Sequence, residues 1–196
     1  MTLPDPRALA IQTVKDPAGA ARVLMDIGLP RSTLWTALVL MAVLQSVIFA
    51  VSDMMLAGPT PFPVLFGSPL RFFTMAVVAL VLMVHAIHRA GRMLGGTGTL
   101  DDVLVIIVWL QALRVAVQVV GLILSVTIPV LAMLLLLVAT VIGIYILLHF
   151  IDQAHRLGSI GQAVLVLFAS VLVIVFGLSL ILALIGLPLV GNAAYV

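Results

Sequence analysis

Three polar side chains lie within an otherwise apolar segment, residues 102–127. Gln111, Arg114 and Gln118 are spaced i, i+3 and i+7, so a helix would carry them on one stripe. At 1.5 Å per residue, Arg114 lies about 18 Å from Asp102, near the middle of a membrane span. An arginine at that depth costs at least about 2.5–3.5 kcal/mol on insertion scales, so we expect it to face the bundle interior or water and to find acceptors.

Gln45, in the first apolar segment, is the expected partner of Arg114, because the two residues lie at a similar depth. Asp53 and backbone carbonyl groups are the other candidates. Two interpretations stay open. The residues Gln45, Gln111, Arg114 and Gln118 could form an anion or lipid-headgroup site or a polar pathway, or they could form a structural polar cluster that fixes the register of the helices.

A second set of titratable side chains lies near the ends of two other apolar segments. Two histidines are spaced i, i+3, and a group of two histidines and one aspartate steps by three residues along the chain. Histidine and aspartate ligate zinc and other divalent ions. They also cap helix ends at a membrane interface, and no HxxxH or HExxH spacing supports the metal. The candidate metal ligands are His85, His88, His149, Asp152 and His155.

A glycine-rich polar loop, LGGTGTLDD at residues 94–102, precedes the segment that carries Arg114. The loop follows no predicted strand and matches neither GxGxxG nor GxxxxGK[ST], so a nucleotide site is not expected. Its glycines permit a tight turn, and Thr99 or one of the two carboxylates is expected to cap the next helix. The loop residues of interest are Gly95, Gly96, Gly98, Asp101 and Asp102.

The remaining residue types argue against several functions. The chain has no cysteine, and no serine has a predicted base beside it, so we find no nucleophile, base and orienting group for catalysis and expect neither an enzyme nor a cofactor. The net charge is only +2, which argues against nucleic acid as a partner.

The composition requires a lipid environment. Hydrophobic residues make up 64% of the 196 residues and charged residues 8%, with a mean hydropathy of +1.40. Soluble domains carry about 25% charged residues, and they cannot bury this much apolar surface.

Residues 1–33 form an N-terminal cytoplasmic or interfacial helical segment. Two Asp-Pro pairs suit helix starts and predict short helices at about 6–14 and 17–27. The second helix is amphipathic, so it should lie on the membrane surface or pack on the ends of the spans.

Five apolar segments follow in residues 34–196, each long enough to cross a hydrocarbon core of about 30 Å. The sequence therefore predicts an all-α polytopic membrane protein with five transmembrane helices. The predicted spans are about 34–57, 70–90, 102–127, 129–151 and 162–187.

Lysine and arginine counts give the orientation. With five spans, the N-terminal segment lies on the same side of the membrane as the loop between spans 2 and 3 and the loop between spans 4 and 5. That side holds seven basic residues and the other holds Arg71 alone, which predicts a cytoplasmic N-terminus and an external C-terminus. The seven are Arg7, Lys15, Arg22, Arg31, Arg89, Arg92 and Arg156.

This topology resembles that of the Yip1 family of membrane proteins. The glycine-polar loop 94–102 is similar to the start of that family's third span, and Asp16-Pro17 through Pro30 is similar to the lead-in of prokaryotic members. The resemblance implies a non-enzymatic protein of the inner membrane. Eukaryotic relatives are linked to vesicle trafficking, small-GTPase partners and membrane shaping, but the short N-terminal segment here lacks their long acidic or aromatic-rich tail.

The leading hypothesis is therefore a Yip1-like scaffold or partner-binding protein in membrane organisation or trafficking. One alternative is a transporter or channel for a small solute, ion or lipid that uses the stripe with Arg114. Another is an accessory subunit of a larger membrane complex. Membrane lipids are expected partners, and other membrane proteins or a second copy of the chain stay open as further partners.

Overall fold

A computed structural model of the chain describes residues 4–56 and 68–184, and all regular secondary structure in these residues is helical. Position 57 of the first predicted span and positions 185–187 of the fifth lie outside them. The helices are α1 (Pro6–Lys15), α2 (Pro17–Asp26), α3 (Arg31–Met55), α5 (Pro69–Met93), α6 (Leu100–Thr127), α7 (Pro129–His155) and α8 (Ile160–Leu184).

Helices α3, α5, α6, α7 and α8 are long and apolar enough to cross a membrane, which confirms the prediction of five transmembrane helices. Local sequence sets where several helices begin. Asp5 and Asp16 accept hydrogen bonds from backbone N–H groups of the first turns of α1 and α2, with proline at the next position. Pro129 likewise begins α7, because the first helical position needs no N–H donor.

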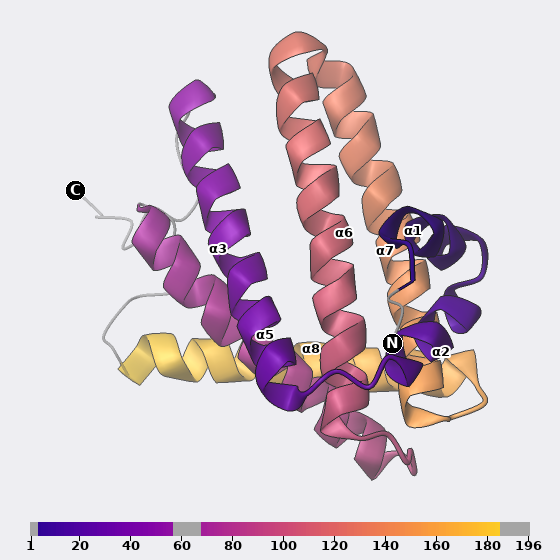
Figure 1. Cartoon of the computed structure of the whole chain (residues 1–196). Helices are drawn as coiled ribbons and strands as arrows, with labels where there is room; N and C mark the ends of the chain where they lie inside the picture. The colour runs from indigo at the N-terminus through magenta and orange to yellow at the C-terminus, as the bar shows by residue number, and fades with distance from the viewer. Residues whose placement is uncertain (1–3, 57–67, 185–196) are drawn as a thin grey trace.

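The long helices are not all aligned. Helices α6 and α7 form a hairpin, and α1 and α2 lie beside α7 (Figure 1). Helix α8 packs on α5 and α7 and runs across the direction of α6 and α7 (Figure 1). We call the end where α3 and α6 begin and α7 ends the charged end, because Arg31, Asp101 and Arg156 lie there.

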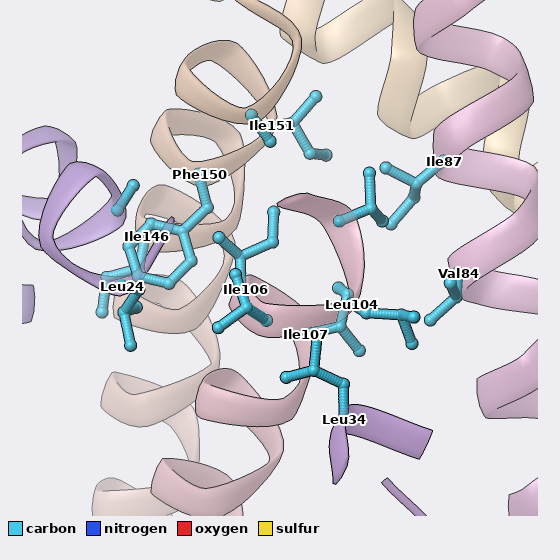
Figure 2. Packing of buried hydrophobic residues seen from close by; sticks show 14 of the residues in the cluster. Leu24, Leu34, Val84, Ile87, Leu104, Ile106, Ile107, Ile146, Phe150 and Ile151 are labelled. Atoms are coloured by element: carbon cyan, nitrogen blue, oxygen red, sulfur yellow. The ribbon is translucent and has the colours of Figure 1, made fainter. Parts of the chain in front are cut away.

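The hydrophobic core lies near the charged end. All five residues 103–107 of α6 are buried, so neighbouring helices cover the whole circumference of α6 at this level. Figure 2 shows side chains of α2, α3, α5 and α7, among them Leu24, Leu34, Ile87 and Phe150, gathered around these first turns of α6. In the rest of α6 only Gln111 and Gly121 are buried, so the packing is looser away from the charged end.

The N-terminal helices belong to this core. Leu9 of α1 and Ala20, Ala21 and Leu24 of α2 are buried in the same cluster as the long helices. Of the two positions expected for the amphipathic helix, the structure therefore has α2 packed on the spans, against α6 and α7.

Candidate functional site

The two carboxylates at the start of α6 have different roles. Asp102 forms a capping box with Thr99: Thr99 Oγ1 accepts the N–H of Asp102 at 3.1 Å, and Asp102 Oδ2 accepts the N–H of Thr99 at 3.0 Å. This confirms the expected cap. Arg156 Nη1 lies 3.8 Å from the same Oδ2. Asp101 instead accepts two hydrogen bonds from Arg31, at 2.6 and 3.1 Å, and so joins the first turns of α3 and α6.

Three glycines, Gly91, Gly96 and Gly98, surround His155, the last residue of α7. The residue is fully buried. A Cβ atom at Gly91 would overlap the imidazole ring, one at Gly96 would overlap the Cβ of His155, and one at Gly98 would overlap the backbone carbonyl of Ala154. These glycines therefore let the last turn of α5 and the loop that follows it approach the end of α7 closely. Gly95, at φ +89°, has the left-handed backbone conformation expected for a glycine in a tight turn.

The contact between the glycine loop and the end of α7 contains two buried ring nitrogens that have no hydrogen-bond partner. The N–H of Thr97 donates to the carbonyl oxygen of His155 at 2.9 Å, and His155 Nδ1 lies 3.2 Å from the carbonyl oxygen of Ile151. His155 Nε2 and His88 Nδ1 are buried without a hydrogen-bond partner, and the two rings have their centroids 6.4 Å apart. Buried polar atoms without partners are uncommon, so the two neighbouring histidines stand out among the polar groups of the charged end.

The other three candidate metal ligands bond close to their own positions. His85 and His149 each direct Nδ1 to the carbonyl oxygen four residues earlier, at 2.8 and 2.9 Å. Asp152 accepts the N–H of Ser159 at 2.9 Å and the side-chain amide of Gln153 at 3.0 Å. Of the predicted set, His88 and His155 are brought together from two different helices. In the part of the chain that the structure describes, no three His or Asp side chains are placed to hold a metal ion.

The polar stripe of α6 is divided between a bonded pair and two unbonded groups. Gln45 Nε2 donates to Gln111 Oε1 at 3.1 Å, and both residues are buried. Gln45 thus lies at the expected depth, but its partner is Gln111, and the expected contact with Arg114 is not formed. Arg114 is exposed and makes no hydrogen bond or ion pair with any described residue. The buried Gln118 Oε1 also has no partner.

Arg114 is exposed at the middle of a predicted membrane span, where an arginine without acceptors is costly. It lies about 21 Å along α6 from Leu100, the middle of the helix. Gly121, seven residues further along α6 and so on the same face, is buried. Arg114 therefore points toward the inner side of the bundle at a level where the neighbouring helices leave it uncovered.

Two contacts of the N-terminal helices were not predicted. Trp109 Nε1 donates to Thr13 Oγ1 at 2.9 Å, and Arg22 Nη1 donates to Gln153 Oε1 at 2.8 Å. The first contact had a signal in the sequence, since a tryptophan within an apolar helix needs an acceptor for its N–H. Nothing in the sequence identified Thr13 as that acceptor.

A family model, described as Yip1 domain, matches residues 11–181 of the chain. The match begins within α1 and continues into α8, so it includes the capped start of α6, the glycine loop and the polar stripe. No curated protein matches the chain, and neither does any solved structure.

Proposed function

The chain belongs to the Yip1 domain family, and from this premise we propose that it is a non-enzymatic integral membrane scaffold that binds a partner protein within the bilayer. Its role would lie in membrane organisation or trafficking. The proposal needs a surface at which a membrane-embedded partner is recognised, and the middle of α6 offers one.

The observation that carries the proposal is the state of Arg114. A guanidinium at the centre of a span is costly without acceptors, and Gln111, one turn earlier on α6, is already bonded to Gln45. Gln118 Oε1, one turn further on, has no partner. A transmembrane segment of another protein that carries a hydrogen-bond acceptor, such as a carboxylate, would satisfy Arg114.

The proposed orientation has the charged end in the cytoplasm of a bacterial cell and the C-terminus outside. Its support is the distribution of seven lysines and arginines against one, which follows the positive-inside rule. The arginines at the starts or ends of helices, Arg31, Arg89, Arg92 and Arg156, all belong to the charged end.

Photo-crosslinking tests the partner. A benzoylphenylalanine replaces Val117, which is half-buried one turn from Arg114. We expect a discrete crosslinked adduct in native membranes that disappears with Arg114→Met and persists with Arg114→Lys. A probe at the exposed Met133 of α7 serves as the control. The proposal fails if the Val117 adduct is absent or is indifferent to Arg114→Met while the protein stays folded.

A second candidate function, transport of a small solute, ion or lipid, is favoured by the same unbonded groups, because Arg114 and Gln118 could line a polar route. Cysteine labelling separates the two. The chain has no cysteine, so Val117→Cys introduces a single thiol. A scaffold covered by its partner predicts slow labelling by a membrane-impermeant methanethiosulfonate. Labelling as fast as that of Asp53→Cys, an exposed position near the end of α3, would favour transport.

A further inference from the structure

The last turns of α5 carry a second polar stripe, separate from that of α6. His85, His88, Arg89 and Arg92 are spaced i, i+3, i+4 and i+7, so they share one side of the helix. Arg89 and Arg92 are exposed, and neither guanidinium makes a hydrogen bond or an ion pair with a described residue. Two uncompensated positive charges therefore lie close together at the charged end.

An aromatic side chain of α3 borders this stripe. The ring of Trp35 stacks on His85 with centroids 5.8 Å apart. Trp35 lies one turn after Arg31, which begins α3, so the stacked rings lie near the end of the span. Tryptophan is enriched at the level of the lipid headgroups, which places the stripe at the membrane interface.

Three carboxylates of this end are already engaged. Asp101 accepts two hydrogen bonds from Arg31. Asp102 caps α6 and lies near Arg156, and Asp152 accepts from the turn after α7. None of these three is bonded to the arginines of α5, so within the part of the chain that the structure describes the two guanidinium groups stay available to an external ligand.

The last carbonyl groups of α5 do not bind the two arginines either. Basic side chains often bond the last carbonyls of a helix. Here the carbonyl oxygens of Ala90, Gly91 and Arg92 accept the N–H groups of Leu94, Gly96 and Gly95. The backbone of the glycine loop takes that role, and the guanidinium groups stay available for another ligand.

We propose that this stripe binds the phosphate headgroup of an anionic phospholipid, with Arg89 and Arg92 as the main ligands and His85 and Trp35 at the edge of the site. Guanidinium groups hydrogen-bond phosphate oxygens with good geometry. In the proposed orientation the site faces the cytoplasmic leaflet, where anionic lipids attract basic residues next to a span. A lipid fits better than a soluble anion, because the site adjoins the apolar surface of α5.

Native mass spectrometry of the purified full chain tests the proposal, with phosphatidylglycerol and phosphatidylcholine as the two probes. We expect the wild-type chain to bind phosphatidylglycerol more tightly. Arg89→Gln with Arg92→Gln should weaken that affinity by about tenfold to thirtyfold, as the loss of two basic residues near a membrane surface implies, and should leave phosphatidylcholine binding unchanged. Arg7→Gln with Lys15→Gln is the matched control, because it removes the same charge from α1.

Three results would overturn the proposal: equal binding of the two lipids by the wild-type chain, an equal loss in the α1 control, or displacement of phosphatidylglycerol by inorganic phosphate, which would indicate a soluble ligand. If the double glutamine variant does not fold, Arg89→Lys with Arg92→Lys replaces it. That variant keeps the charge and should retain selectivity for phosphatidylglycerol with reduced affinity.

Discussion

The indole N–H of Trp109 donates a hydrogen bond of 2.9 Å to the hydroxyl oxygen of Thr13, and this contact fastens α1 to the side of α6. The Thr13 hydroxyl in turn donates to the carbonyl oxygen of Leu9 at 2.8 Å, and Thr13 is fully buried. Trp109 lies about 13 Å along α6 from Leu100. The N-terminal helices are therefore attached to the side of α6, more than two helical turns from its start at the charged end, and not only to the loops.

Trp109→Phe should loosen α1 without unfolding the bundle. The phenyl ring keeps most of the packing but loses the hydrogen bond, at a cost of about 0.5–1.5 kcal/mol. We expect faster amide hydrogen exchange in α1 and little change in α6. Trp35→Phe is the control, since Trp35 stacks on His85 and should leave exchange in α1 unaltered. Equal effects of the two substitutions would contradict a specific role for Trp109.

Gly91→Ala should destabilise the charged end because its Cβ would overlap the imidazole of His155. Overpacking of this kind costs about 1–3 kcal/mol, measurable by unfolding in SDS. Adding His155→Ala should recover part of the loss, because the overlapping ring is removed. Gly98→Ala should not be rescued in this way, since its Cβ would overlap the backbone of Ala154.

Gly143→Ala provides the contrast to these glycines. No atom lies within 4 Å of a Cβ at this position, which is inside α7, and alanine is the better helix former by up to about 1 kcal/mol. We expect unchanged or slightly higher stability. A loss as large as that of Gly91→Ala would mean that the glycines act through something other than close approach to His155.

The sequence allowed the helices to be predicted, because hydropathy, length and Asp-Pro or Thr-Asp starts are local properties. It did not allow the direction of α8 to be predicted. Helix α8 is apolar on all sides, and a helix without a polar face carries no periodic signal of what it packs against. Its crossing of α6 and α7 follows from tertiary packing on α5, which no single segment encodes.

For the candidate site, the depth of each polar residue could be predicted from the sequence, but its bonding partner could not. Depth along a helix can be counted from the sequence, so Gln45 was correctly placed at the level of the α6 stripe. The choice of partner depends on the rotation and tilt of two helices. A shift of about one helical turn along α6 is enough for Gln45 to bond Gln111 and not Arg114. The glycine loop shows the same limit: its turn was readable, but its contact with His155, far away in the chain, was not.

Thr99→Ala should cost more stability than Arg31→Gln, although both residues contact a carboxylate at the start of α6. Thr99 satisfies a backbone N–H at the helix start, and such caps contribute about 0.5–2 kcal/mol. The pair of Arg31 and Asp101 is largely exposed, so solvent and salt weaken it. Unfolding in SDS at two salt concentrations should show a salt-dependent effect for Arg31→Gln only. A salt-dependent loss of the same size for Thr99→Ala would contradict the assignment.

Gln45 and Gln111 should show strong coupling in a double-mutant cycle. Replacing either residue by leucine leaves the other buried amide without its partner, which costs more than the bond itself contributes. Replacing both removes the unpaired group, so the double variant should be more stable than the sum of the single effects predicts. Hydrogen bonds between membrane helices average about 0.6 kcal/mol, with a maximum near 1.7 kcal/mol, and the coupling energy should fall in this range.

Ser46→Ala is the control for that cycle, because the buried Ser46 hydroxyl bonds the carbonyl oxygen of Ala42 in its own helix and should not couple to Gln111. Additive effects at positions 45 and 111 would show that the pair does not hold α3 to α6.

The cycle also tests the role of Arg114. If Gln45 and Gln111 only join two helices, the double leucine variant should retain the crosslink from position 117, because the partner is recognised by Arg114. Loss of that crosslink in a stable double variant would place the glutamines in the partner-binding surface itself.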